Sequence, residues 1–501
     1  MSMIAGRVRR NVLWNWAALG TSMVIAFIST PILFNGLGEE MYGAWTLVMS
    51  IAGYVAFFDL GMRTSVVRGY AEANAVNDEM RQARIITNSL VHFICVGILI
   101  FACALIFTRF SASLYDLKNY AFEFNAAFLL IAFKVAASLP FNSLTGALLG
   151  MERYDISCLV QIVFGALGAF VMVMLVLHGY GIIPLAAIST VFGLGGIITM
   201  AACFVWITRK WQIGLKYLDW ETYKDLAKIG SAFVMISISH TVLSVAGPFI
   251  VGAVAGLDKA ASFAIAFSLF KYVESSIQSG ARVLVPFVAR EAANTSSGDT
   301  TDIALRAAEM AFGVTLSILV AFCVAGEGFL VAWLNKTSVL EIYQAFIVMT
   351  IGGLFNSYTK VVMNVFVGLG KVRAISVESV LELIVFLAGM YILTERYGIL
   401  GAALAMALVF IVVRLPVYLY VMVRQFSLPR TMKSLLLLAL KSLLICAAGY
   451  LLSNIPLPES KNVFVWLGIC GVCFAFLLGI FCLASFVRVR SLVRLCTGRR
   501  G

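Results

Sequence analysis

Apolar runs of about twenty residues follow one another along almost the whole chain, with short polar segments between them. One α-helix needs about twenty residues to cross the hydrocarbon core of a bilayer. Because no water is available there, a spanning segment must satisfy its own backbone hydrogen bonds, which favours helices. The pattern predicts fourteen transmembrane helices, at residues 11–34, 41–60, 85–108, 122–149, 157–178, 181–207, 230–254, 260–289, 306–334, 341–369, 375–394, 398–423, 433–453 and 463–487.

The composition supports an all-α polytopic membrane protein. Of the 501 residues, 61% are hydrophobic and 12% are charged, whereas soluble proteins have about 25% charged residues. The first apolar stretch continues to Leu33, which is too long for a signal peptide and predicts a retained first span. The ten cysteines lie mostly in apolar runs. Cys470 and Cys473 form a CxxC, but no second pair or histidine cluster accompanies them, so we expect neither a disulfide framework nor a metal site.

The charge of the loops predicts the orientation. Lys and Arg are several times more frequent in the loops on the side of the N-terminus than in those on the opposite side, and such an excess marks the cytoplasmic side. An even number of spans then places both termini in the cytoplasm. The net charge of +12 follows from this topology, so we expect no nucleic-acid partner.

Short motifs recur at a nearly constant offset. Gly61-x-Arg63 is repeated as Gly280-x-Arg282, and Pro31 matches Pro248 in the same way. Six spans per repeat is an even number, so the repeats are expected to be parallel. We predict an N-terminal lobe at 1–207, a cytoplasmic linker at 208–229, a C-terminal lobe at 230–424, and two extra helices with a basic tail at 425–501.

Polar residues at helical spacing follow one face of several predicted spans, where an ionisable side chain costs about 2.5–3.5 kcal/mol and needs a partner or a function. They are Lys134, Ser138, Asn142 and Thr145 in span four; Ser237, Thr241 and Ser244 in span seven, with His240 beside them; Lys271, Glu274, Gln278 and Arg282 in span eight; and Asn356, Lys360 and Asn364 in span ten. We interpret these stripes, which come from both predicted lobes and face each other, as the walls of a polar, net-positive cavity.

In this interpretation Lys134, Lys271, Arg282 and Lys360 bind the substrate, and polar groups beside them complete the cavity. Those groups are Asn142, Glu274, Gln278, Asn356 and His240. The alternative is that small polar residues hold helices together, that Glu274 is the local partner of Lys271, and that His240 is a hydrogen-bonded core group. Glu382 and Arg414, at similar depth on neighbouring spans, are predicted to form a structural ion pair.

The chemistry of a positive cavity suits an anionic substrate, because Lys and Arg hold phosphate oxygens by charge-assisted hydrogen bonds. The sequence has no phosphate-binding loop and no nucleophile–base constellation. We therefore expect a transporter without a cofactor, and not an enzyme. Asp59, Arg63 and Arg68 follow the second span, where we predict a cytoplasmic gate or, equally, a topology anchor and helix cap.

The segment from Gly36 to Trp45, followed by Phe58-Asp59-Leu60-Gly61, Val67-Arg68 and Ala71-Glu72, resembles the N-terminal signature of the polysaccharide-biosynthesis flippases. These are the Wzx-type oligosaccharide-lipid transporters of the multidrug/oligosaccharidyl-lipid/polysaccharide exporter superfamily. The resemblance implies two six-helix bundles that enclose a V-shaped cavity with alternating access. Its implied cargo is a polyprenyl-diphosphate-linked oligosaccharide of O-antigen, capsule or exopolysaccharide, moved across the bacterial inner membrane.

The resemblance also implies several partners. The cationic residues would attract the diphosphate or acidic sugars, while membrane lipids and spans thirteen and fourteen accommodate the polyprenyl chain. Glycosyltransferases and a polymerase of the same pathway are further expected partners. Coupling to a proton or sodium gradient would use Glu274 or His240, by position. The alternatives are a peptidoglycan lipid precursor flippase, a cation-coupled multidrug exporter of the same superfamily, and a scaffold without transport activity.

Overall fold

The computed structural model describes residues 2–53, 61–115, 117, 120–209, 213–282, 297–335, 338–368, 372–426, 428–458 and 460–485. The described residues are almost all helical and include no strand. The chain divides into two compact units, Met1–Ala261 and Ser262–Gly501. The helix α12 (Leu257–Arg282) begins in the first unit and continues into the second.

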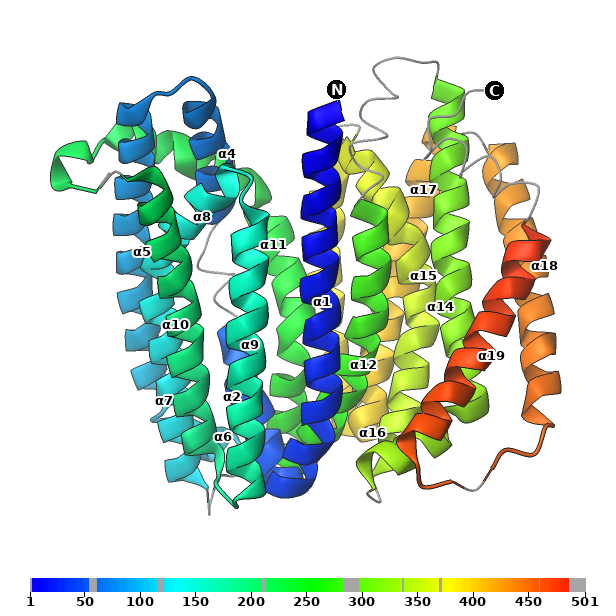
Figure 1. The fold of residues 1–501 in the computed structure, drawn as a ribbon. Helices are drawn as coiled ribbons and strands as arrows, with labels where there is room; N and C mark the ends of the chain where they lie inside the picture. Colours follow the sequence, from blue (N-terminus) through cyan, green and yellow to red (C-terminus); the bar gives the residue numbers. More distant parts are fainter. Residues whose placement is uncertain are drawn as a thin grey trace. The chain divides into compact units, whose positions relative to one another are not determined.

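The first unit is a helical bundle (Figure 1). Its elements are α1 (Ser2–Leu37), α2 (Glu39–Gly53), α4 (Met62–Ala75), α5 (Glu79–Phe107), α6 (Ser111–Leu114), α7 (Ala121–Ser138), η1 (Leu139–Phe141), α8 (Asn142–Gly150), α9 (Tyr154–Leu177), α10 (Ile182–Thr208), η2 (Leu215–Tyr217) and α11 (Trp220–Ala255). Within this unit α10 packs against both α7 and α9, and α1 packs along α9.

The predicted fourth span is interrupted at one point. Pro140 lies in the short 3₁₀ helix η1 between α7 and α8. A proline inside a helix removes one backbone hydrogen bond and clashes with the preceding turn, which accounts for the break. Consequently the polar stripe of this span is divided, with Lys134 and Ser138 on α7 and Asn142 and Thr145 on α8.

The second unit contains the remaining helices. They are α14 (Ser297–Leu334), α15 (Val339–Gly368), α16 (Val372–Leu408), the π-helix η3 (Val409–Arg414), α17 (Leu415–Phe426), α18 (Leu428–Ser453) and α19 (Val463–Ala484). The helix α14 packs against α15 and also against α18 and α19. The two C-terminal helices therefore attach to the rest of their unit mainly through α14.

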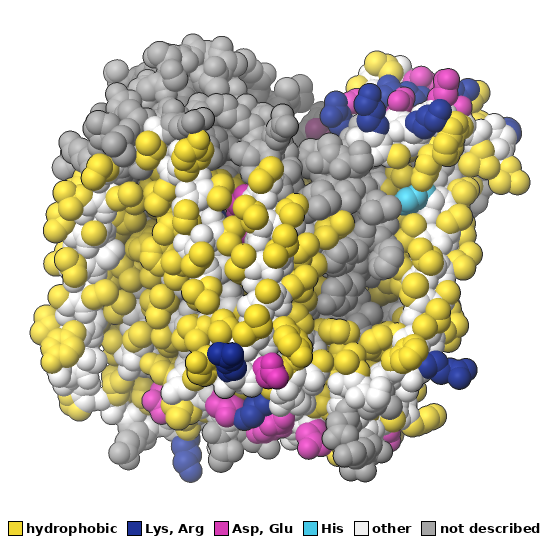
Figure 2. Space-filling model, turned by 180° about the vertical axis from the view of Figure 1, so that it is seen from behind, with side chains coloured by type: hydrophobic (Ala, Val, Ile, Leu, Met, Phe, Trp, Pro, Cys, Tyr) yellow, Lys and Arg dark blue, Asp and Glu magenta, His cyan; other side chains and the backbone are white. Residues whose placement is uncertain are grey.

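Eleven helical segments of the described residues are long and apolar enough to cross a membrane. One of them, Val377–Tyr420, covers predicted spans eleven and twelve, and Gly398 inside it has a non-helical φ of 56°. The helices α2 and α12 are not among the eleven. On the face drawn in Figure 2, hydrophobic side chains cover the helices and most charged side chains gather near helix ends. The protein is thus a multi-pass membrane protein, and the count of fourteen stays a prediction.

The boundary between the two units differs in place from the predicted linker at 208–229. It lies between Ala261 and Ser262, because α11 packs against α2, α4 and α5 of the first unit. The prolines of the proposed repeat, Pro31 and Pro248, both lie inside helices, α1 and α11. The internal repeat and its lobe boundaries stay predictions.

Candidate functional site

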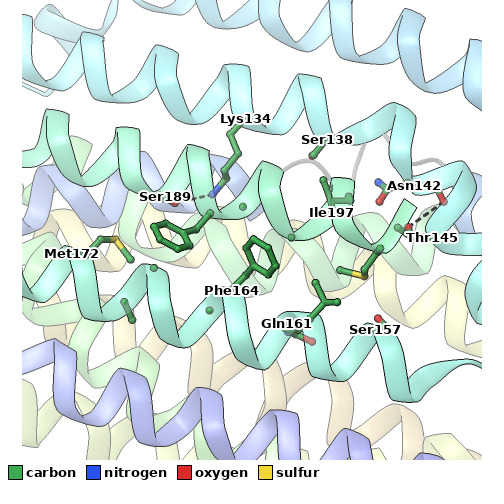
Figure 3. Close-up of a pocket in the computed structure, with 18 of the residues that line it drawn as sticks. Lys134, Ser138, Asn142, Thr145, Ser157, Gln161, Phe164, Met172, Ser189 and Ile197 are labelled. Atoms are coloured by element: carbon green, nitrogen blue, oxygen red, sulfur yellow. Dashed lines mark hydrogen bonds between the residues drawn. The ribbon is translucent and has the colours of Figure 1, made fainter. Parts of the chain in front are cut away.

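A cavity of about 510 Å³ lies inside the first unit, among α7, α8, α9 and α10 (Figure 3). One wall carries the polar stripe predicted from the sequence, Lys134, Ser138, Asn142 and Thr145. Ser157 and Gln161 of α9 line the opposite wall. With Ser189 of α10, the structure gathers hydroxyl, amide and ammonium groups from four helices around one space.

Lys134 is the cation inside this cavity. Its side chain is half-buried, and its Nζ atom donates a hydrogen bond of 3.0 Å to the Oγ atom of Ser189 on α10. Gly193, one turn further along α10, leaves room for the lysine, because a Cβ there would come within 2.9 Å of the Lys134 Cδ atom. Among the described carboxylates, none forms a recorded ion pair with Lys134.

The remaining lining residues add apolar surface and a second cation. The rings of Phe164 and Phe192 meet edge to face, with centroids 6.5 Å apart. Arg63 of α4 also lines the cavity. The described lining residues include no aspartate and no glutamate. The cavity is consequently positive, and an anion with polar hydroxyl groups suits it better than a cation does.

Glycines of α9 and α10 keep the cavity open. A Cβ on Gly168 would come within 3.2 Å of Phe192, and one on Gly195 within 2.9 Å of Phe164. Gly165 also lines the cavity, but a Cβ there would meet no atom within 4 Å. The position of Gly165 therefore borders open space.

The second unit contains predicted residues of spans eight and ten, and it brings four of them together. Glu274 of α12 accepts from Lys271 at 2.8 Å and also forms an ion pair with Lys360 of α15. The amide of Asn356 donates to the same carboxylate at 3.0 Å. Lys360 is 4% exposed and Asn356 is 1% exposed, so this contact lies in the interior of the unit.

Arg414 extends the same network. Its Nη2 atom donates to Glu382 at 2.7 Å, its Nε atom donates to Glu378 at 3.1 Å, and a further nitrogen donates to the side-chain oxygen of Asn356. Arg414 ends the π-helix η3, and such local widening of a helix is frequent at functional sites. Asn356 therefore joins the Arg414 group to the Glu274 group.

The second unit therefore places acidic side chains against cations that were expected to line a net-positive cavity. Lys271 and Lys360 share Glu274, and Arg414 contacts two glutamates. Sequence reasoning overlooked Glu378, although it lies four residues before Glu382 and hence on the same helical face. It also overlooked Glu309 of α14 as the partner of Lys441 of α18, whose Nζ lies 3.0 Å from the Glu309 carboxylate.

Other predicted residues lie elsewhere. Asp59 and the side chain of Arg282 fall outside the described residues. Arg68 is exposed and pairs with Glu72 at 2.9 Å, and Arg81 contacts the same carboxylate at 3.1 Å. Hydrogen bonds from Arg68, chiefly, hold the pKa of Glu72 below its usual value. His240 is exposed in the first unit, and Gln278 is half-buried in the second.

Comparison with known proteins agrees with these observations. A protein of Shigella flexneri named "Putative O-antigen transporter" is 23% identical over 412 residues, which cover 79% of this chain and 93% of that protein. This relative and the solved structures described next are transporters or flippases rather than enzymes, as expected from the sequence.

Solved structures of the MOP superfamily share the fold. An inward-facing multidrug resistance MATE family transporter has a TM-score of 0.69 and 16% identity, and covers 82% of this chain and 96% of its own. The lipid II flippase MurJ, in an inward closed conformation, has a TM-score of 0.69 and 13% identity, and covers 96% of this chain and 100% of its own. A transporter from Pyrococcus furiosus has a TM-score of 0.60 and 15% identity, and covers 83% and 95%.

Family membership follows from the sequence itself. The model of the family described as "Polysaccharide biosynthesis protein" matches residues 8–291, which is more than half of the chain. The match includes all the helices that line the cavity of the first unit. The chain belongs to the polysaccharide biosynthesis protein family.

Proposed function

We propose that this protein is a flippase that moves a polyprenyl-diphosphate-linked oligosaccharide across the bacterial cytoplasmic membrane by alternating access. Family membership and the transporter fold support this function. The observation that carries it is the positive cavity of the first unit, with Lys134 inside it and no acidic residue among its described lining residues.

The lining of the cavity suits the head group of such a lipid. Lys134 and Arg63 can donate charge-assisted hydrogen bonds to phosphate or carboxylate oxygens. The hydroxyls and amides of both walls can bind sugar hydroxyls, while Phe164 and Phe192 offer apolar faces. The volume of about 510 Å³ falls in the usual range for small-molecule sites. The head group therefore enters the cavity, and the polyprenyl chain stays in lipid.

Transport of a peptidoglycan lipid precursor is the second candidate. It is favoured by the likeness to the lipid II flippase, which covers 96% of this chain, but that likeness concerns the fold. A cationic drug is a weaker candidate, since Lys134 and Arg63 would repel it. Loss of the gene distinguishes the first two candidates: a polysaccharide flippase mutant loses surface polysaccharide without lysis, whereas a peptidoglycan flippase mutant lyses.

Filling the cavity tests the proposal. Gly165→Leu introduces a side chain into open space, so the fold should tolerate it while the head group loses its place. Gly471→Leu on α19, where a Cβ also meets nothing within 4 Å, is the matched control. In a strain deleted for the gene, Gly471→Leu should restore surface polysaccharide and Gly165→Leu should not, at equal protein level. Full export by Gly165→Leu would contradict the assignment of this cavity.

The proposed orientation places both termini in the cytoplasm, where glycosyltransferases of the same pathway would supply the substrate. Reporter fusions after residue 501 and in the segment between α18 and α19 test this orientation. A phosphatase active only outside the cytoplasm should be inactive at the C-terminus and active in the α18–α19 segment.

A further inference from the structure

Glu378 and Glu382 of α16 share one guanidinium group. Arg414 donates to Glu378 at 3.1 Å and to Glu382 at 2.7 Å. The two glutamates are 1% and 2% exposed, and Arg414 is 8% exposed. Because arginine stays protonated in proteins, the group carries one positive and two negative charges when both glutamates are ionised.

A net negative charge in the interior of a membrane helix bundle is costly. The two carboxylates lie four residues apart on one helix, so like charges face each other. Burial and a neighbouring like charge both favour the protonated form of a carboxyl group, and a close pair takes up its first proton as a unit. Tyr418 lies one turn beyond Arg414 and is 3% exposed, and its hydroxyl has no hydrogen-bond partner among the described residues.

The second half of the network has the opposite charge. Glu274 lies between Lys271 and Lys360, which leaves one positive charge. Asn356 connects the halves, since its amide nitrogen donates to Glu274 and its oxygen accepts from Arg414. Lys271 is the most accessible of the charged members, with 29% of its side chain exposed. Among the described residues, the charged and titratable groups of this network around the glutamate pair are Arg414 and Tyr418 beside it, Lys360 on α15, and Lys271 and Glu274 on α12.

We propose that Glu378 and Glu382 together hold one exchangeable proton, and that an anion bound at Lys271 and Lys360 favours its uptake. The described network is neutral when all its members are ionised. An anion that competes with Glu274 for the two lysines makes the network negative, and a proton on the glutamate pair restores neutrality. By linkage, the proton and the anion then strengthen each other's binding. This second part rests on the anionic cargo of the proposed function and adds Lys271 and Lys360 to the Lys134 cavity as a second place where that anion binds, whereas the proton site rests on neither.

Infrared spectroscopy of the purified full-length protein tests the proton site without a substrate. A pH titration should show the carboxylic acid band of one buried carboxyl group that titrates. Glu378→Gln and Glu382→Gln should each remove or shift that titration. Glu309→Gln, which alters another buried glutamate paired with a lysine, is the matched control and should leave it unchanged. A titrating band unaffected by both Glu378→Gln and Glu382→Gln, or no such band in the wild type, would overturn the proposal.

Proton uptake on ligand binding tests the linkage. Farnesyl diphosphate is added to the detergent-solubilised protein in weakly buffered solution, and a pH-indicator dye reports protons taken up per ligand bound. The wild type should take up more protons than Glu382→Gln, by up to one per bound ligand, with Glu309→Gln like the wild type. Binding with equal uptake in all three would overturn the linkage. No binding at all would overturn both the linkage and the diphosphate part of the proposed function, and would leave the proton site to the infrared result.

Discussion

Lys134 of α7 and Ser189 of α10 are joined across the cavity of the first unit by a hydrogen bond of 3.0 Å. The lysine supplies the charge that attracts an anion, and the serine holds the ammonium group in place. We predict that Lys134→Met abolishes diphosphate binding to this unit. Ser189→Ala should weaken binding only about twofold to tenfold, because a hydrogen bond contributes about 0.5–1.5 kcal/mol. Isothermal titration with a polyprenyl diphosphate measures both, and equal losses would contradict this division of roles.

A buried ion pair between Glu309 and Lys441 connects α18 to α14. The two side chains are 4% and 8% exposed, and Nζ lies 3.0 Å from the carboxylate. Lys441→Met should destabilise the second unit by about 3–5 kcal/mol, because it removes the lysine that pairs with the buried Glu309 carboxylate. The double variant Lys441→Met/Glu309→Leu should recover most of this loss. Thermal unfolding of the purified protein measures both, and a double variant as unstable as the single one would contradict the explanation.

Aromatic side chains of α19 pack against glycines of α14. A Cβ on Gly313 would come within 2.4 Å of Phe481, and a Cβ on Gly328 within 2.3 Å of Trp466. Alanine normally stabilises a helix by about 1 kcal/mol relative to glycine. Here the added methyl group overpacks the helix contact, so Gly313→Ala should destabilise the protein by about 1–3 kcal/mol instead of stabilising it. Gly468→Ala on α19, where a Cβ meets nothing within 4 Å, is the control and should be neutral or stabilising in the same thermal assay.

Asp219 caps the start of α11 ahead of its membrane span. Its carboxylate accepts from the backbone N–H of Thr222 at 3.1 Å and from the hydroxyl at 2.6 Å, and Arg84 lies 3.7 Å away. The hydrogen bonds from Thr222, chiefly, hold the pKa of Asp219 below its ordinary value of 3.8. Because the pKa of Asp219 is lower in the folded state, its carboxylate contributes its full stabilisation above the unfolded pKa. This stabilisation is lost as the pH falls through the folded pKa.

We therefore expect the cap to be intact at neutral pH and to weaken only in acid. Hydrogen exchange followed by mass spectrometry should show faster exchange at the first turn of α11 in Asp219→Ala at pH 7. Asp219→Asn keeps an acceptor and should have a smaller effect. The difference between Asp219→Asn and the wild type should shrink below about pH 4. If the difference in exchange between Asp219→Asn and the wild type grew as the pH fell, it would contradict a lowered pKa of Asp219 in the folded state.

The polar stripe of the fourth span shows how far sequence reasoning reached. Helical spacing placed Lys134, Ser138, Asn142 and Thr145 on one face, and they line a cavity inside the first unit. The cavity that they were expected to share with the stripes of the second lobe stays a prediction. Ser189 and Gln161 were not singled out. The spacing of Ser157 and Gln161, four residues apart and so on one helical face, was a signal that could have found Gln161. Ser189 lies beside Thr190 in an apolar run and has no such spacing to mark it. Spacing identifies residues that share a helical face, but it does not report which other helix that face meets.

The charged residues of the second unit show where sequence reasoning was incomplete. Lys271, Glu274 and Lys360 were recognised as costly charges and expected in a net-positive cavity, whereas both lysines pair with Glu274. Their partners come from other helices: Glu274 reaches α15, and Arg414 of η3 reaches two glutamates of α16. Charge balance in a buried network depends on which side chains meet, and that is a tertiary property.

The sequence by itself determined the membrane-spanning helical class, since hydropathy over twenty residues depends only on local composition. It also determined which helices carry ionisable groups, because each such group is a local exception in an apolar run. Tertiary structure alone decided that Lys134 faces a cavity bordered by α9 and α10, while Lys271 and Lys360 share a carboxylate. The reason is physical: the charge that a buried cation presents depends on the carboxylates within a few ångströms, and those belong to helices distant in the chain.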